Sequence, residues 1–240
     1  MKKIISLIFS ILLTLLLSVS SLASPTYKNN YAYIFGYNDN IMGAEENVLR
    51  CEVSSMIYRL VKQNGYLEGF VYNKNNPAIY TDIEDEWFRS AIEFMVYRGV
   101  FPRDVETIRP YEPITRMEAF RMIALGLDFT NNNNFPGKEY SKILKEAGYI
   151  QGNENGDLQE DKYLTRAEFC AIYNRIINRE NAKLRTKDKI KITAETYGFV
   201  DLKEEAWYYE TMLKATSSYD KSGFVDLELR GNRNEIDDYE

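Results

Sequence analysis

The chain has 240 residues, a formal net charge of −6 and no histidine. The lack of histidine excludes a Ser-His-Asp triad, a Cys-His pair and an imidazole-ligated metal site. The acidic balance argues against nucleic acid as the main partner, because phosphate binding needs a basic face.

Residues 1–23 have the pattern of a secretory signal peptide. Lys2 and Lys3 precede an apolar stretch from Ile4 to Val19, and a cleavage signal ends at Ala23. The alternative is a membrane anchor, but the apolar run is short for a span and no stop-transfer flank follows it. Cleavage removes two lysines and no acid, which takes the net charge from −6 to −8. We therefore expect an exported chain that makes no membrane contact after cleavage.

Three later segments share one pattern: a short β-prone run, a turn rich in Gly, Asn, Asp or Pro, and the start of a helical pattern. They are residues 32–53, 99–119 and 148–169. Counted from the first residue of each segment, Arg50, Arg116 and Arg166 lie 18, 17 and 18 positions further on. This self-similarity predicts three copies of the second half of a structural repeat.

The first half of the repeat recurs at residues 80–99 and 199–216. Asp82 and Asp201 are predicted helix N-caps, and Trp87 and Trp207 are predicted core anchors. A weaker copy at residues 139–150 lacks both the Asp and the Trp.

Along the chain the halves follow in the order second, first, second, first, second, first. The series of repeats thus starts with a second half and ends with a first half. This predicts that the final helix, around Glu204–Ala215, closes onto the unit at residues 32–62. The predicted domains are residues 24–72, 73–130, 131–180 and 181–223, followed by a loose acidic tail at 224–240.

Two of the three arginines lie inside a predicted capping box. In Thr115–Glu118 and in Thr165–Glu168, the threonine hydroxyl accepts from the third residue on, and the glutamate reaches back to the threonine N–H. Leu49 replaces the threonine in the first unit. The arginine in each box is then the first helical residue, where its charge opposes the helix dipole at a cost of up to about 1 kcal/mol.

A nearby anion would reverse that cost, because a helix N-terminus favours negative charge and offers free N–H groups. The planar fork of arginine also suits a carboxylate. The candidate ligand-binding residues are therefore Arg116, Arg166 and Arg50, with Thr115 and Thr165. The alternative is an internal salt bridge from each arginine to Glu118, Glu168 or an Asp of a neighbouring unit.

The motifs "YTDIEDEW", "IRPYEPITRME", "GYIQGNENGDL" and "LTRAEF" resemble the S-layer homology family. The resemblance implies a mainly α fold with short β-strands and three-fold pseudo-symmetry. It also implies a secreted, non-catalytic protein on the wall of a Gram-positive-type bacterium. The implied partner is a secondary cell wall polysaccharide or peptidoglycan-linked glycan, whose pyruvate ketal carboxylate contacts box arginines such as Arg116 and Arg166.

Two other functions compete with wall binding. One is a scaffold whose degenerate repeats bind another surface protein. The other is a carboxylate-pair glycosidase, which is disfavoured because the acids already fit caps and first helical turns. A calcium loop at residues 153–161 fails because its glycine is at the fourth position, and no cofactor or metal is expected.

The two cysteines and the arginines give two further expectations. Cys51 and Cys170 form either a disulfide or two buried thiols. Replacing Arg116 and Arg166 together by alanine is expected to weaken wall binding while leaving folding nearly intact.

Overall fold

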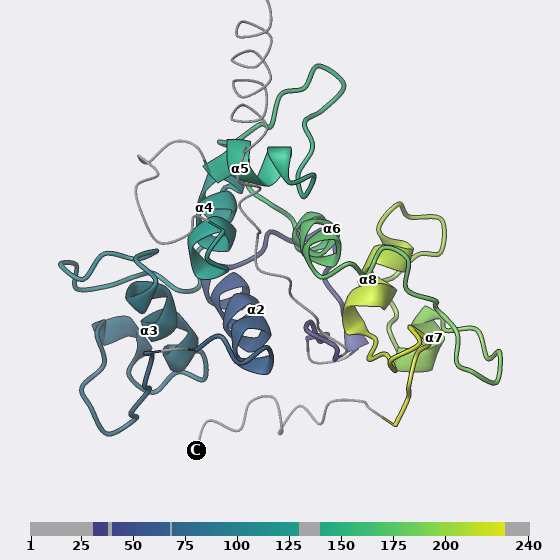
Figure 1. The fold of residues 1–240 in the computed structure, drawn as a ribbon, viewed down its shortest axis with the longest axis horizontal. Coiled ribbons are helices and arrows are strands. Elements are labelled where there is room, and N and C mark those ends of the chain that lie inside the picture. The colour runs from purple at the N-terminus through teal and green to yellow at the C-terminus, as the bar shows by residue number, and fades with distance from the viewer. Residues whose placement is uncertain (1–30, 38–39, 68, 130–139, 229–240) are drawn as a thin grey trace, which may run out of the picture.

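The computed structural model describes residues 31–37, 40–67, 69–129 and 140–228 (Figure 1). The predicted signal peptide and residues 229–240 of the predicted tail lie outside this part. Within it the chain is mainly helical, and extended backbone appears as isolated β-bridges. The predicted mainly α class with short β segments is confirmed. The helices are α2 (Arg50–Gln63), the 3₁₀ turn η2 (Thr81–Ile83), α3 (Arg89–Tyr97), α4 (Arg116–Gly126), α5 (Tyr140–Glu146), α6 (Arg166–Ile176), α7 (Ala194–Tyr197) and α8 (Tyr209–Thr216).

The helices that follow the three arginines begin as the capping boxes predict, with one difference. The hydroxyls of Thr115 and Thr165 each accept from the backbone N–H three residues on, at 3.2 Å. Glu168 closes the second box by accepting from the N–H of Thr165 at 3.0 Å. Glu118 is the difference: its Oε1 accepts from Arg50, and the structure shows no bond from its carboxylate back to Thr115. Each box therefore fixes where its helix starts.

The three segments that precede α2, α4 and α6 meet in a closed ring of backbone hydrogen bonds. The N–H of Val48 donates to Leu164 at 2.9 Å, Leu164 donates to Ile114 at 3.1 Å, and Ile114 donates to Val48 at 3.2 Å. All three side chains are fully buried. The ring satisfies three backbone donors in the centre of the core, where no water is available to them. The three-fold pseudo-symmetry of the whole domain stays a prediction.

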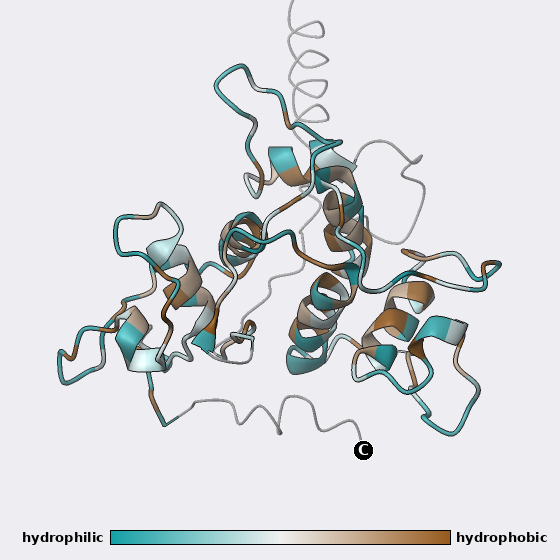
Figure 2. Ribbon diagram, turned by 180° about the vertical axis from the view of Figure 1, so that it is seen from behind, coloured by the Kyte–Doolittle hydropathy of each residue, from teal (hydrophilic) through white to brown (hydrophobic). Residues whose placement is uncertain are grey.

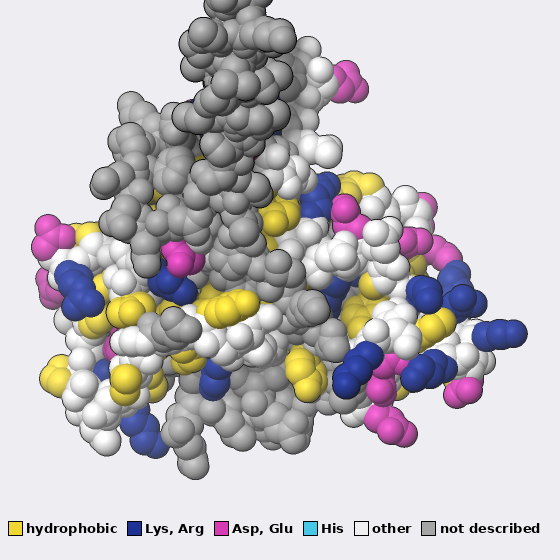
Figure 3. Space-filling model, in the orientation of Figure 1, with side chains coloured by type: hydrophobic (Ala, Val, Ile, Leu, Met, Phe, Trp, Pro, Cys, Tyr) yellow, Lys and Arg dark blue, Asp and Glu magenta, His cyan; other side chains and the backbone are white. Residues whose placement is uncertain are grey.

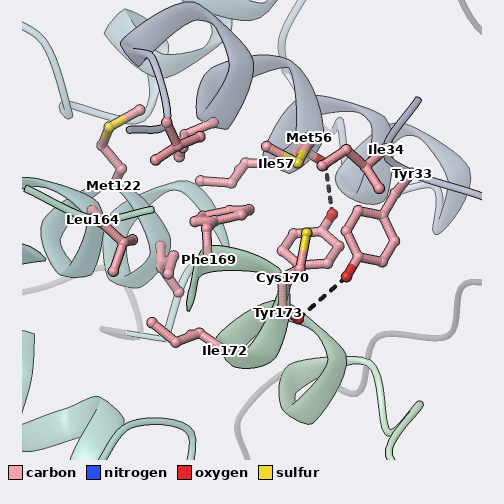
Figure 4. Packing of buried hydrophobic residues seen from close by; sticks show 14 of the residues in the cluster. Tyr33, Ile34, Met56, Ile57, Met122, Leu164, Phe169, Cys170, Ile172 and Tyr173 are labelled. Carbon is pink, nitrogen blue, oxygen red and sulfur yellow. Dashed lines mark hydrogen bonds between the residues drawn. The ribbon is translucent and has the colours of Figure 1, made fainter. Parts of the chain in front are cut away.

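The helices pack in pairs around this ring. α2 contacts α3, α4 contacts α5, α6 contacts α8, and α2 also contacts α4 (Figure 1). Apolar and polar residues alternate along the helices, as expected for elements with one buried face (Figure 2). The buried side chains form one large cluster, in which the hydroxyl of Tyr173 donates to the carbonyl of Met56 at 2.6 Å (Figure 4).

The predicted closure between the two ends of the described chain is present. The N–H of Tyr33 donates to the carbonyl of Ala215 at 3.1 Å. The carboxylate of Asp201 accepts from the N–H groups of Met42 and Gly43, both at 2.8 Å. Helix α8 packs on α6, and it contacts the first unit through the carbonyl of Ala215 in its last turn, while the side chain of Asp201 makes the second contact before the helix.

The structure corrects the predicted role of the two repeated aspartates. Asp82 is not the N-cap of α3, which begins later at Arg89. Its carboxylate accepts from the N–H of Ile108 at 3.1 Å and from that of Arg109 at 2.7 Å. Asp201 makes the same kind of contact to the first unit. Each carboxylate therefore holds the loop before a box helix, because two adjacent N–H groups point at it: Asp82 holds the loop before α4, and Asp201 holds the loop before α2.

The prediction that the two tryptophans anchor the core is wrong. The exposed fractions are 47% for Trp87 and 64% for Trp207. The next residues, Phe88 and Tyr208, are buried instead. Each indole packs edge-on against its buried neighbour, with ring centroids 5.3 Å and 5.6 Å apart. The repeat thus pairs one buried and one exposed aromatic ring.

The C-terminal boundary also differs from the prediction. Phe224 forms a parallel bridge with Lys183, and Val225 forms an antiparallel bridge with Tyr219. Val225 is buried against Ile192 and Tyr219. The ordered part therefore extends beyond residue 223, where the loose tail was predicted to begin.

Both cysteines are buried free thiols, so of the two alternatives the thiols are correct. Burial raises the pKa of Cys51 and of Cys170 to about 12. In the part of the chain described, every helix is too short or too polar to span a bilayer.

Candidate binding groove

Each box arginine pairs with the box glutamate of another unit. The N–O distances are 2.7 Å for Arg50–Glu118, 3.3 Å for Arg116–Glu168 and 2.5 Å for Arg166–Glu52. The three pairs form a second closed cycle around the ring of backbone hydrogen bonds. The internal salt bridges that the sequence left as an alternative are therefore present.

The other donors of these guanidinium groups go to backbone carbonyls in neighbouring loops. Arg166 donates to the carbonyls of Met42 and Phe35, both at 3.1 Å. Arg50 donates to Ile108 at 2.8 Å, and Arg116 donates to Leu158 at 2.8 Å. Each arginine thus holds the turn before another unit.

The three arginines also differ in accessibility and do not form one shared site. The exposed fraction of the side chain is 3% for Arg166, 8% for Arg50 and 15% for Arg116. Thr115 and Thr165 cap the helices beside Arg116 and Arg166. The structure therefore places the predicted ligand-binding residues at three separate corners of the ring.

A hollow of about 330 Å³ opens at the corner that contains Arg166. We call it the α2 groove, because α2 forms one wall. Its other walls are the extended segment at residues 33–37 and the exposed Trp87. The lining residues that are polar or aromatic are Tyr33, Phe35, Tyr37, Glu52, Arg59, Trp87 and Arg166. The volume is at the lower end of the range for small-ligand pockets.

Cations and aromatic rings alternate along the groove. The guanidinium of Arg59 lies 5.9 Å from the ring centroid of Phe35 and 5.8 Å from that of Trp87. Arg166 lies 4.3 Å from the ring centroid of Tyr37. Guanidinium groups favour the faces of aromatic rings, and these contacts hold both cations in place.

One carboxylate faces these two cations, and its oxygens are already engaged. Oε1 of Glu52 accepts from Arg166 and from the hydroxyl of Tyr37 at 2.7 Å, and Oε2 accepts from the N–H of Leu49 at 2.9 Å. Burial and the neighbouring Glu52 raise the pKa of Tyr37 well above its ordinary value. Its hydroxyl therefore remains a donor to Glu52 at any ordinary pH, and the groove lining keeps a net positive charge.

Sequence reasoning missed Arg59, Tyr37 and Trp87 as site residues. The repeat register contains a signal for Arg59: it lies nine positions after Arg50, and Arg175 lies nine positions after Arg166. The corresponding position after Arg116 is Leu125. The corner next to α4 thus lacks this cation, and the first half-repeat at 139–150 also lacks the tryptophan.

The motif pattern agrees with a comparison to known families. Residues 79–120 match the S-layer homology domain. This segment contains Trp87 and the Thr115–Glu118 box. The family prediction is therefore confirmed for the repeat that combines both halves.

Two relatives from Acetivibrio thermocellus extend the similarity along the chain. "Cell surface glycoprotein 1" is 26% identical over 170 residues, which is 62% of this chain and 7% of the relative. "Cellulosome-anchoring protein" is 22% identical over 193 residues, which is 74% of this chain and 42% of the relative. The chain thus spans less than half of each relative. Their names describe surface and anchoring proteins, which supports a role at a bacterial cell surface.

Proposed function

We propose that the chain holds an exported protein at the bacterial cell wall, as a non-catalytic module that binds an anionic, pyruvylated secondary cell wall polysaccharide in the α2 groove. One observation carries the proposal: two guanidinium groups and two partly exposed aromatic rings surround a hollow of about 330 Å³. The S-layer homology match and the names of the two relatives agree with this function.

The lining residues would divide the work of recognition. The rings of Tyr37 and Trp87 offer apolar faces to a sugar ring, and their polar edges remain accessible to water. Arg59 and Arg166 attract the carboxylate of a pyruvate ketal, which is ionised at any pH that the wall experiences. Arg166 is 3% exposed and bound to Glu52, so we assign it the electrostatic role. We assign the direct contact to Arg59, because its guanidinium lies beside the exposed ring of Trp87.

The other two corners would contribute unequally. The corner next to α6 has Arg116 in the ring, Arg175 at the position of Arg59, and the exposed Trp207. The corner of Arg50 has neither an arginine nor a tryptophan at these positions. We therefore assign Arg116 a weaker contribution to binding, and Arg50 mainly a role in holding the fold. Thr115 and Thr165 act indirectly, by fixing the helix starts beside the arginines.

Sedimentation with purified cell walls tests this proposal. More of the protein should sediment with native walls than with walls whose pyruvate groups have been removed. Trp87→Ala should bind about tenfold more weakly, the usual order for loss of an aromatic anchor. Trp207→Ala is the comparison variant, because it removes the exposed indole of the weaker corner, and it should lose less binding than Trp87→Ala.

Other outcomes would identify the competing functions. Equal sedimentation with native walls and with walls that lack both the pyruvate and the polysaccharide would instead support a scaffold for another surface protein. Release of soluble sugar fragments during incubation would show an enzyme.

A further inference from the structure

A second charged surface lies outside the α2 groove, on a hairpin that we call the basic hairpin, residues 183–191. Five of its nine residues are cationic and one, Asp188, is acidic, which gives this segment a net charge of +4 in a chain of −6. All five cationic residues are exposed. They are Lys183, Arg185, Lys187, Lys189 and Lys191.

The backbone of the basic hairpin is fixed by hydrogen bonds. The N–H of Thr186 donates to Ile190 at 3.0 Å, and that of Ile192 donates to Leu184 at 3.0 Å. Ile192 is buried with Tyr219 in a small apolar cluster. The inward side chains hold the hairpin to the domain, so the cations on the outward positions are presented on an ordered surface.

Two of these cations oppose each other across the hairpin. Arg185 and Lys191 form an antiparallel bridge, so their side chains leave the two strands side by side. Like charges at directly opposite positions destabilise a strand pair. Lys183 and Arg185 both lie over the ring of Phe224: the Nζ atom and the guanidinium carbon are 4.0 Å and 5.5 Å from its centroid. These cation–π contacts hold the two cationic side chains close together.

Carboxylates of the domain offset only part of this charge. Lys187 pairs with Asp220 at 2.8 Å, and Lys191 pairs with Glu204 at 3.1 Å. Among the residues that the structure describes, no ion pair joins Lys183, Arg185 or Lys189 to a carboxylate. Figure 3 shows Lys and Arg side chains, with a few acids among them, along the edge of the molecule beside α7.

We infer that the basic hairpin is a second wall contact, which binds the phosphodiester backbone of an anionic polyol phosphate polymer. The five cations occupy every second position from 183 to 191 on this one hairpin, so a flexible chain that carries repeated phosphates can contact several of them at once. A phosphate placed beside Arg185 and Lys191 also reduces the repulsion between them. The choice of a wall polymer over other polyanions rests on the proposed function.

Titration with purified poly(glycerol phosphate) over a series of salt concentrations tests the inference. If five cations engage, the slope of log K against log salt is about −3.5 for a flexible polyanion. Lys183→Gln, Arg185→Gln and Lys189→Gln together should bring the slope to about −1.4. The control carries the same change in charge on other exposed lysines: Lys74→Gln, Lys145→Gln and Lys162→Gln. It should retain the slope of the wild type.

Several results would overturn the inference. They are no binding of poly(glycerol phosphate) by the wild type, equal loss in the control variant, or tighter binding of double-stranded DNA than of the polymer at equal phosphate concentration. The groove variant Trp87→Ala should bind poly(glycerol phosphate) as the wild type does. A failure of the hairpin therefore appears with the polymer, and a failure of the α2 groove appears with depyruvylated walls.

Discussion

The burial of Arg166 predicts that Arg166→Ala and Arg116→Ala have very different effects on stability. Arg166 and its partner Glu52 are 3% and 11% exposed, whereas Arg116 and Glu168 are 15% and 37% exposed. Removing one partner of a buried pair costs about 3–5 kcal/mol, because the remaining charge is left uncompensated. The carbonyls of Met42 and Phe35 lose a donor as well. The α2 groove admits water to this corner, so we expect about 3 kcal/mol.

The corresponding loss for Arg116→Ala is about 1 kcal/mol, as for a partly exposed ion pair. This revises the sequence-based expectation that replacing both arginines leaves folding nearly intact. Urea unfolding followed by far-UV circular dichroism separates the two variants. With an m-value of about 2 kcal/mol/M, Arg166→Ala lowers the urea midpoint by about 1.5 M and Arg116→Ala by about 0.5 M.

A second substitution distinguishes charge burial from simple loss of packing. Glu52→Gln in the Arg166→Ala background removes the uncompensated carboxylate, so the double variant should recover about 1 kcal/mol. Equal midpoints for the two single variants would refute the reasoning, as would a double variant that is less stable than Arg166→Ala alone.

Three shorter predictions follow from the same contacts. Phe88→Ala should lower the free energy of unfolding by about 3–5 kcal/mol and Trp87→Ala by less than about 1 kcal/mol, because only the first ring is buried; thermal melts compare them. Asp201→Ala should cost about 2 kcal/mol by leaving two buried backbone N–H groups without an acceptor, and equal stability of Asp201→Ala and wild type would contradict the closure. The pKa values of Cys51 and Cys170 are raised from an ordinary 9.0 to about 12, so the folded state favours the neutral thiols. The contribution of the neutral thiols to the free energy of unfolding is complete below pH 9 and is lost as the pH rises toward 12. Urea midpoints measured over that pH range, with Cys170→Ala for comparison, report this loss.

Local sequence patterns predicted the helix starts and the closure, because both depend on short-range signals that recur. The threonine of each box lies directly before a helix, and the same spacing appears in three places. The count of half-repeats then required the end of the chain to meet residues 32–62. The hydrogen bond between Tyr33 and Ala215 shows this contact.

The errors arose where helical periodicity was applied outside a helix. Trp87 precedes the first residue of α3, and Trp207 precedes the first residue of α8. At these positions the backbone, not the helical period, decides which of two neighbouring aromatic rings faces the core. Asp82 was assigned to a cap for the same reason, although its partners lie 26 and 27 positions away. Such long-range pairings have no signature in a local window.

The site itself was predictable only in part. The sequence identified the box arginines and the possibility that they form salt bridges with box glutamates. Nothing in the sequence showed that Arg166 pairs with Glu52 rather than with Glu168. That choice depends on which units adjoin around the ring. Arg59 could have been identified only by extending the comparison of the repeats nine positions past the box arginine, into α2.

The cyclic hydrogen bonds that join Val48, Ile114 and Leu164 have a consequence for how the protein is made. An open array of repeats can gain stability one unit at a time. Here the first segment cannot complete its pairing until the third has been synthesised, and Tyr33 waits for Ala215. The nascent polypeptide thus stays unlocked until its last described helix is available.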